Sequence, residues 1–352
     1  MASLKNKRVL VVGGAGFVGS NLCLNLLKND VSHVEVVDNL MSADISNVPV
    51  DERLHFTHGS AADDRILSSV GVDYDYVFHL ATYHGNQSSM LDPIADHDNN
   101  TLPMLKLAEH FKGVKKLEKF VYSSAGCTVA QKTFDDAAAT TEEDPVSLYL
   151  DSPYQISKII GEFHGNYYFM RHNFPLVKAR FQNVYGPREI LGAGLWRKGP
   201  ATVWRNVTPT FLWKSLHGEA LPVEKGGVAT RDFIYVDDIV AGLISCALRG
   251  KAGEAYNLAS GDETSILTLA ETMNELTANK AGIDMKSARE WDRSGKRYGS
   301  TEKARQELDF QAQVPLKVGL EKTVAWTKEN MVNIKRIMQN HVYYMPELTK
   351  YL

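Results

Sequence analysis

The chain has 352 residues, of which 44% are hydrophobic and 23% are charged, and its formal net charge is −3. These values are ordinary for a globular protein of one large domain or two smaller ones, and they give no basic excess that would attract nucleic acid. No apolar run reaches the roughly 18 residues that a membrane span needs, and the N-terminus lacks the apolar core of a signal peptide. We therefore expect a cytoplasmic protein that neither inserts into a membrane nor binds nucleic acid.

Short β-branched segments alternate with longer amphipathic segments through the first half of the chain. In chain order, this pattern predicts a strand at 8–12, a helix at 21–28, strands at 34–38 and 76–80, a helix at about 100–111, a strand at 119–123, a helix at 153–171 and a strand at 177–181. Ser152 and Pro153 occupy the preferred N-cap and first positions of the long helix. Strands that alternate with helices are typical of βαβ units and of a doubly wound parallel sheet.

The alternation ends near Gly186, where glycine and proline cluster and the predicted elements become shorter. We expect an α/β protein in two parts. Residues 1–185 would form the larger domain and carry the catalytic residues. Residues 186–352 would form a smaller C-terminal α/β lobe that binds the substrate, with some exchange of chain between the two and an amphipathic helix closing the lobe.

A glycine-rich turn separates the first predicted strand from the first helix, and it reads Gly13-Gly14-Ala15-Gly16-Phe17-Val18-Gly19. Gly14, Gly16 and Gly19 fit the GxGxxG pattern. In this pattern the glycines allow a tight turn, close approach of the backbone to a pyrophosphate and close packing of the helix on the strand. An ordinary glycine turn is the alternative, but the position between a strand and a helix favours a Rossmann-type domain.

Asp38 ends the second strand 19 residues after Gly19. A carboxylate at this position can bond the 2′-hydroxyl of an adenosine ribose, although a loop carboxylate without such a role is the alternative. Asp38 would repel the 2′-phosphate of NADP, and no arginine lies between residues 38 and 47 to accept it. The sequence therefore predicts NAD as the cofactor.

The residues KFVYSS at 119–124 place Ser123 and Ser124 at the C-terminal end of a strand, which is the ligand-binding edge of an open α/β sheet. Tyr154 and Lys158 are four residues apart, so they share one face of the following helix. An ammonium group near a phenol favours the phenolate, which can take a proton from a sugar hydroxyl. A surface Tyr–Lys pair is the alternative. The glycine-rich turn and Ser124 together favour a catalytic group of Ser124, Tyr154 and Lys158.

These motifs resemble those of the extended short-chain dehydrogenases/reductases, in the nucleotide-sugar epimerase/dehydratase family, over nearly the whole chain. The resemblance implies a cofactor site made of the phosphate loop, the ribose-binding strand end, the adenine side, the nicotinamide side, an asparagine and the catalytic region. The implied contacts are Gly13, Gly14, Gly16, Phe17, Val18, Gly19, Asp38, Asn39, Leu40, Ser60, Ala61, Leu80, Ala81, Thr82, Asn99, Ser123, Tyr154 and Lys158.

The same resemblance implies contacts to a nucleotide-sugar substrate in the second lobe. Asn183 lies in RFQNVYGPRE, Arg231 in TRDFIYVDDIV and Arg293 in RSGKRYGSTEKARQELDF. Guanidinium groups suit diphosphates, although a solvated surface arginine is the alternative for each. Tyr83 and His84 follow the nicotinamide-side strand and could line the sugar pocket with Ser124, although His84 could equally be a structural hydrogen-bonding residue.

Two departures from the family pattern concern the adenine site and the catalytic chemistry. Ser60 and Ala61 stand where the family often has an acidic residue near adenine. Ala125, Gly126 and Cys127 follow Ser124, where family dehydratases carry Asp-Glu and decarboxylases a glutamate. Cys127 is similar to the cysteine of 3,5-epimerases but lies one residue further along, and a small buried side chain that fills space is the alternative.

We therefore expect a nucleotide-sugar 4-epimerase that acts on a UDP-hexose or its uronic or N-acetylated form through transient oxidation at C4. The alternatives are a decarboxylase, a dehydratase or a 3,5-epimerase of the same family, and a non-catalytic regulator that senses NAD. Biosynthesis of cell-surface polysaccharide, such as lipopolysaccharide O-antigen, is the pathway that the resemblance implies.

We also expect a homodimer, because family members pair through the two helices predicted at about 100–111 and 153–171. The second helix carries the aromatic residues Phe163, Tyr167, Tyr168 and Phe169. We expect no metal, since the cysteines Cys23, Cys127 and Cys246 lie far apart without a CxxC spacing and no HExxH motif occurs. This cysteine pattern suits a reducing compartment.

Overall fold

The computed structural model describes residues 3–129, 133–288 and 295–352, without the side chain of Cys127. Seven parallel strands form the main sheet in the order β11-β6-β5-β4-β1-β2-β3. The strands are β1 (Arg8–Val12), β2 (His33–Asp38), β3 (Leu54–His58), β4 (Tyr76–His79), β5 (Lys119–Ala125), β6 (Leu176–Phe181) and β11 (Ala255–Leu258). The order reverses between β1 and β4, which opens a crevice at their C-terminal ends. The predicted Rossmann-type, doubly wound sheet is confirmed.

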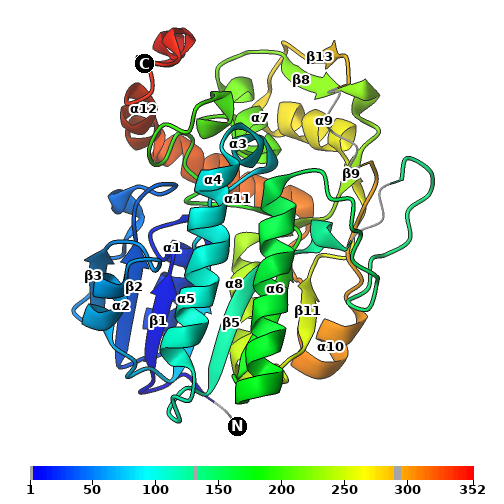
Figure 1. Ribbon diagram of the computed structural model, residues 1–352. Coiled ribbons are helices and arrows are strands. Elements are labelled where there is room, and N and C mark those ends of the chain that lie inside the picture. Colours follow the sequence, from blue (N-terminus) through cyan, green and yellow to red (C-terminus); the bar gives the residue numbers. More distant parts are fainter. Residues whose placement is uncertain (1–2, 130–132, 289–294) are drawn as a thin grey trace.

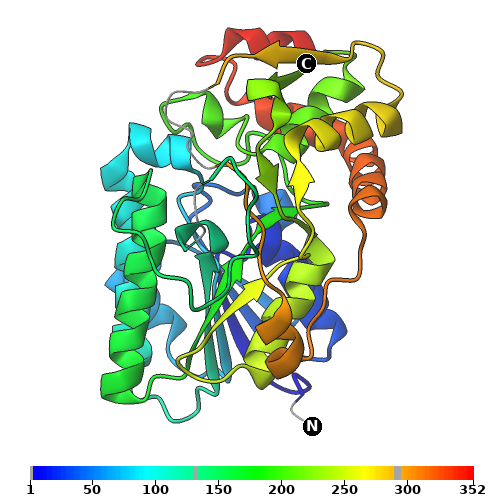
Figure 2. The ribbon, with the colours of Figure 1, turned by 90° about the vertical axis from the view of Figure 1, so that its right-hand side faces the viewer.

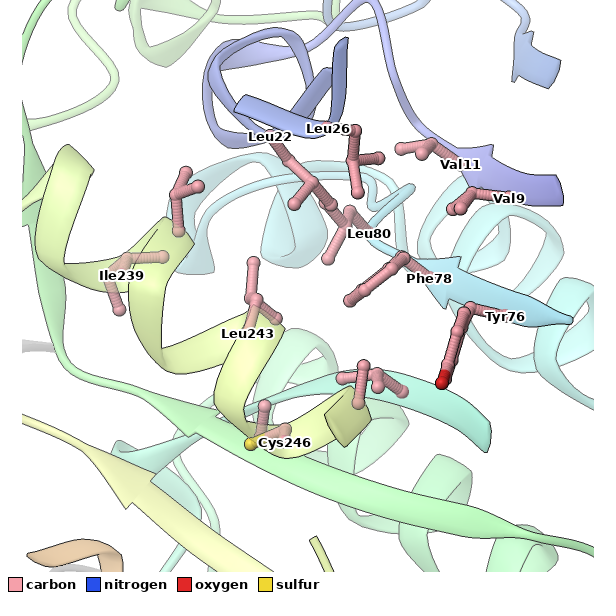
Figure 3. Close-up of a cluster of buried hydrophobic side chains, with 14 of the residues drawn as sticks. Val9, Val11, Leu22, Leu26, Tyr76, Phe78, Leu80, Ile239, Leu243 and Cys246 are labelled. Carbon is pink, nitrogen blue, oxygen red and sulfur yellow. The ribbon is translucent and has the colours of Figure 1, made fainter. Parts of the chain in front are cut away.

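One face of the sheet is covered by α1 (Phe17–Lys28) and α8 (Val236–Arg249), with α10 (Glu302–Leu308) packed on α8 and β11. Figure 3 shows how apolar side chains of α1, α8, β1 and β4 converge between the helices and the strands. The strands are apolar along almost their whole length because helices cover both faces of the sheet. The labelled members of this cluster are Val9, Val11, Leu22, Leu26, Tyr76, Phe78, Leu80, Ile239, Leu243 and Cys246.

The opposite face is covered by α2 (Asp64–Val70), α5 (Leu102–Phe111) and α6 (Pro153–His172). Figure 2 shows α6 on one side of the sheet and α8 and α10 on the other. Two short helices, α3 (Asn86–Leu91) and α4 (Pro93–Asp96), and a π-helical turn (His97–Thr101) connect β4 to α5. They place the segment after β4 against the N-terminal end of α6.

The rest of the chain builds a smaller part above the C-terminal edge of the sheet (Figure 1). Three two-stranded sheets pair β7 with β10, β8 with β13 and β9 with β12. Two further apolar clusters hold this part together. Its elements are β7 (Asn183–Tyr185), α7 (Val207–Leu216), β8 (Leu221–Glu224), β9 (Thr230–Arg231), β10 (Phe233–Tyr235), β12 (Thr264–Ser265), α9 (Ile266–Thr277), β13 (Ile283–Lys286), α11 (Leu316–Glu329) and α12 (Met331–Gln339).

Two differences from the predicted elements have local causes. Helix α1 begins at Phe17, inside the glycine-rich turn, because Gly19 packs against the backbone of Gly13 and Gly14. Strand β3 and helix α2 were not predicted from the sequence. Strand β3 lies at the edge of the sheet, and its partly exposed, polar residues give no apolar run. Helix α8, strand β11 and helix α10 come from beyond residue 186 and return to the main sheet. None of the helices in the described ranges has both the length and the apolar character of a membrane span.

Candidate active site

A cavity of about 410 Å³ lies at the C-terminal edge of the sheet, where the strand order reverses. Its wall includes the glycine-rich turn, the ends of β2, β4 and β5, the start of α6 and the segment between β7 and α7. The main sheet and the smaller part of the protein thus enclose one site. Ligand sites of open α/β sheets occur at this position.

The glycine-rich turn forms one wall of the cavity. Gly13 has a φ of +90°, and a Cβ atom there would lie 2.4 Å from the backbone nitrogen of Ala81. Gly16 caps α1 without a side-chain hydrogen bond, so the first N–H groups of the helix are not capped by that residue. A helix N-terminus of this kind binds anions such as a pyrophosphate.

Asp38 lies in the cavity wall at the end of β2, and the residue is 8% exposed. It accepts hydrogen bonds from the N–H groups of Ala15 at 3.0 Å and Leu40 at 2.9 Å. Burial raises the pKa of Asp38, and these N–H groups partly oppose that rise. Each carboxylate oxygen retains a further lone pair that can accept a ribose hydroxyl.

The residues present fit a dinucleotide cofactor, since a glycine cradle, a helix N-terminus and a buried carboxylate border one cavity. Most of the predicted cofactor contacts lie in its wall. Gly14 instead packs on Val36 of β2, and Leu40 donates its N–H to Asp38. Those in the wall are Gly13, Gly16, Phe17, Val18, Gly19, Asp38, Asn39, Ser60, Ala61, Leu80, Ala81, Thr82, Asn99, Ser123, Tyr154 and Lys158.

Tyr154 and Lys158 project from the first two turns of α6. Ser152 caps this helix by accepting from the Gln155 N–H, as predicted, and the Tyr154 N–H is bonded to Ser89 Oγ of α3 at 3.1 Å. Lys158 donates to the carbonyl oxygen of Ser123 at 2.9 Å, and its ammonium lies 5.8 Å from the centre of the Tyr154 ring. Helix α6 therefore presents a phenol and an ammonium to one cavity.

Ser124 lies in the same cavity wall, but its hydroxyl already has a partner within the protein. It donates to the carboxylate of Glu162 at 2.5 Å, and Glu162 in turn forms a buried ion pair with Arg180 of β6. The structure thus brings the predicted trio together and adds two charged residues behind Ser124. Glu162 lies in no recognisable motif, and Arg180 is the first residue of RFQNVYGPRE, in which only Asn183 was predicted to bind.

The predicted sugar contacts after β4 separate into two environments. His84 lies in the cavity wall, with its ring centre 6.0 Å from that of Tyr154 and its Nδ1 without a hydrogen-bond partner. Burial, Arg205, Arg197 and Lys158 lower the pKa of His84 to about 3, so this imidazole is neutral. Tyr83 lies outside the wall, donates its N–H to Asn100 and packs under Arg197.

The predicted diphosphate contacts are also divided. Asn183 lies in the cavity wall at the start of β7. Arg231 is buried outside it and donates to the carbonyl oxygens of Thr230 and Gly295. Arg293 lies outside the described residues, whereas Arg297, four residues further along, lies in the wall.

Several charged residues of the wall, in the segment that joins β7 to α7, were not among the predicted site residues. Arg188 donates to Ser20 Oγ and to the Asn47 carbonyl oxygen, and Arg205 donates to the carbonyl oxygens of Thr202, Ser42 and Ala193. Burial raises the pKa of Glu189 to about 7, against the hydrogen bond from Asn206 and the charge of Arg205. This segment has no helical or strand periodicity. Arg188 and Glu189 end the motif RFQNVYGPRE, whereas Arg205 lies in no motif.

No group of three or more His, Cys, Asp or Glu side chains suited to a metal occurs in the part of the chain that the structure describes. Cys23 and Cys246 are buried free thiols. Cys127 belongs to a short 3-10 turn after β5, and its side chain lies outside the described residues.

Comparisons with known proteins agree with this geometry. A model of the NAD dependent epimerase/dehydratase family matches residues 9–259. The Bordetella bronchiseptica enzyme WbmF, solved in complex with NAD+ and UDP, is 56% identical with a TM-score of 0.88, covering 97% of this chain and 98% of that one. UDP-glucose 4-epimerase from Thermotoga maritima, solved with UDP-glucose, is 28% identical with a TM-score of 0.81, covering 92% and 99%. The dTDP-glucose 4,6-dehydratase of Shigella flexneri is 26% identical over 349 residues, which cover 92% of this chain and 93% of that protein.

Proposed function

Because this chain belongs to the NAD dependent epimerase/dehydratase family, whose members are enzymes that use NAD, we propose that it is a nucleotide-sugar 4-epimerase. The substrate we propose is a UDP-hexose or its uronic or N-acetylated form. The observation that carries this proposal is the pairing of Tyr154 and Lys158 in a cavity where Ala125 and Gly126 follow Ser124. UDP in the WbmF complex and UDP-glucose in the Thermotoga enzyme support the choice of nucleotide.

In this proposal Lys158 stabilises Tyr154 as a phenolate, and this phenolate takes the proton from the O4 hydroxyl of the sugar. When bound, NAD supplies the acceptor and donor of the C4 hydride. The sugar turns over in the cavity as a 4-ketone, and Tyr154 returns the proton when the other face of C4 is reduced. One acid/base residue is enough for these reaction steps. Because residues 125–127 contain no acidic side chain, 4-epimerisation is favoured over dehydration and decarboxylation.

We propose that the predicted cofactor contacts that lie in the cavity wall bind NAD. We propose His84, Ser124 and Asn183 as contacts to the nucleotide sugar. Arg297 is our added candidate for the diphosphate, because its side chain lies in the cavity wall. The roles of Tyr83, Arg231 and Arg293 stay predictions. We also propose that residues 1–185 form a cofactor-binding domain and residues 186–352 a nucleotide-sugar-binding lobe. Helix α8, strand β11 and helix α10 are the part of the second half that returns to the main sheet.

The decisive experiment offers the enzyme a panel of UDP-, dTDP- and GDP-sugars in deuterated water and identifies the products by NMR. We expect one UDP-sugar to give its C4 epimer without deuterium on carbon. Deuterium at C3 or C5 would identify a 3,5-epimerase, and loss of water or carbon dioxide a dehydratase or decarboxylase. If the protein binds NAD but converts no sugar nucleotide, the alternative of a non-catalytic regulator that senses NAD is supported.

The position of Glu189 in the cavity favours a dehydratase as the second candidate function. It is a cavity carboxyl group with a pKa near 7, which suits general acid/base chemistry. Its hydrogen bond to Asn206 and the neighbouring Arg205 equally suit a purely binding role. If Glu189→Gln removes turnover as completely as loss of Tyr154, the 4-epimerase proposal needs a second acid/base residue and the dehydratase is favoured.

We propose a cytoplasmic homodimer that serves cell-surface polysaccharide or O-antigen biosynthesis. Two buried free thiols, Cys23 and Cys246, support a reducing compartment. An apolar stripe along α6 supports the dimer: the side chains of Ile156, Phe163 and Tyr167 are 45%, 57% and 53% exposed.

A further inference from the structure

Glu162 lies behind the reacting groups on the helix that carries them. It follows Tyr154 by eight residues and Lys158 by four, so the three side chains share one face of α6. Its two carboxylate oxygens accept from Arg180 Nε at 2.9 Å and from an Arg180 terminal nitrogen at 2.8 Å. Both side chains are buried, at 4% exposure for Glu162 and 7% for Arg180, and the pair ties α6 to β6.

The carboxyl group of Glu162 is ionised. Burial alone would raise its pKa, but the hydrogen bonds and charge of Arg180, the hydrogen bond from Ser124 and the charge of Lys178 together lower it below its usual value. An ionised carboxylate only accepts hydrogen bonds. The hydrogen of the Ser124 hydroxyl therefore lies on the 2.5 Å contact to Glu162.

A serine hydroxyl has one hydrogen to donate and two lone pairs that accept. Since Glu162 takes the hydrogen, the oxygen of Ser124 can only accept from a ligand in the cavity. It can accept a hydrogen bond from a sugar hydroxyl, but it cannot donate one to a ketone oxygen. Of the two hydroxyl groups in the predicted trio, that of Tyr154 is then the one that can donate to the ketone oxygen.

We propose that Glu162, held by Arg180, is a positioning residue that keeps Ser124 as an acceptor and so withholds a hydrogen bond from the sugar ketone. This inference rests on the proposed 4-epimerase function. The ketone is bound less tightly than the alcohol at this position, so it is free to turn over and is reduced again rapidly. The 4-ketone should accordingly form only a small part of the bound sugar at steady state.

The test replaces the ion pair by apolar side chains in the double variant Glu162→Met/Arg180→Met. Exchange of a buried ion pair for apolar residues of similar volume often preserves stability, which thermal unfolding will check. Without Glu162, the Ser124 hydroxyl can donate to the ketone. Rapid quenching with sodium borodeuteride during turnover marks the ketone with deuterium at C4, and mass spectrometry measures the labelled fraction. We expect the labelled fraction to rise several-fold, up to about tenfold, the effect of one hydrogen bond.

The triple variant that adds Ser124→Ala is the matched control, and its labelled fraction should fall well below that of the double variant, because the donor to the ketone is gone. A rise of the same size in the triple and the double variant, or no rise in a folded double variant, overturns the proposal. If the double variant does not fold, Ser124→Ala alone decides. We expect it to raise KM without lowering the labelled fraction, and a several-fold fall in that fraction would show that Ser124 donates. If the unchanged enzyme forms no C4 epimer from any UDP-sugar, the proposed function fails instead.

Discussion

At the scale of single residues, Tyr154 carries the proton transfer in the proposed reaction. Its phenol and the Lys158 ammonium face one cavity, and His84 beside them is neutral. Tyr154→Phe removes only the hydroxyl, so turnover should fall by about 10²–10⁴-fold while binding of NAD and UDP is kept. Initial rates and a binding titration measure the two effects separately.

Cys127→Ser is the comparison for Tyr154→Phe, because Cys127, with His84, is an additional acid/base candidate that a 3,5-epimerase would use. We expect this variant to be nearly silent. A loss of rate as severe as that of Tyr154→Phe would contradict the 4-epimerase proposal and favour the 3,5-epimerase.

Asp38 should decide between NAD and NADP. Its buried carboxylate can bond ribose hydroxyls but opposes a 2′-phosphate. Asp38→Ala should weaken binding of NADH by about tenfold to a hundredfold, the usual effect of losing hydrogen bonds to a charged group, and should reduce the preference over NADPH. Fluorescence titration with both reduced cofactors measures this. Equal affinity of the unchanged enzyme for both would contradict the assignment.

The residues that the sequence identified are those whose roles depend on a short spacing. The local pattern places Gly13 in the turn between a strand and a helix, and Asp38 at the end of the next strand. It also places Tyr154 and Lys158 four residues apart on one helix. Arg205 and Glu189 lie in a segment without periodicity, and tertiary packing alone brings them to the cavity. Glu162 has no such marker either, since it lies on helix α6 and its partner Arg180 belongs to strand β6.

At the scale of elements, strands with buried faces on both sides were predicted well, because their apolar runs reflect burial directly. The edge strand β3 and helix α2 were not, since exposed positions dilute the pattern. The N-terminus of α6 was predicted from Ser152 and Pro153, and the structure adds why it matters. Ser152 also donates to Asn86 Oδ1, which lies in the cavity wall, at 3.0 Å.

Ser152→Ala should therefore reduce stability and disturb the site together. Loss of an N-cap typically lowers the free energy of unfolding by about 1 kcal/mol. Urea denaturation measures this, and we also expect a higher KM because Asn86 loses its partner. Ser68→Ala, which removes an exposed hydroxyl bonded within α2, is the control and should change neither quantity. Equal effects of the two substitutions would contradict the role of the cap.

At the scale of the whole molecule, the site forms only because distant segments meet. The β7–α7 segment closes the cavity over the C-terminal edge of the sheet, and α8 and β11 return to that sheet from the second half of the chain. Long-range pairing of this kind leaves little trace in local sequence patterns. The break in the alternation near Gly186 supplied the expectation of a second lobe, but the residues that close the cavity came from the structure.

The outer face of α6 makes a prediction about assembly. Of the four aromatic residues expected to pair with a second copy, Tyr168 is buried, whereas Phe163 and Tyr167 are exposed in one stripe with Ile156 and Met170. Such a stripe on a helix already packed on a sheet fits a symmetric contact with a second copy. Phe163→Glu should place a charge in that contact and convert a dimer to a monomer. Light scattering at micromolar concentration measures the mass, and Val332→Glu, at a position that is 83% exposed on α12, is the control that should leave the dimer intact. A monomer before any substitution, or a dimer that survives Phe163→Glu, would show that this stripe is not the contact.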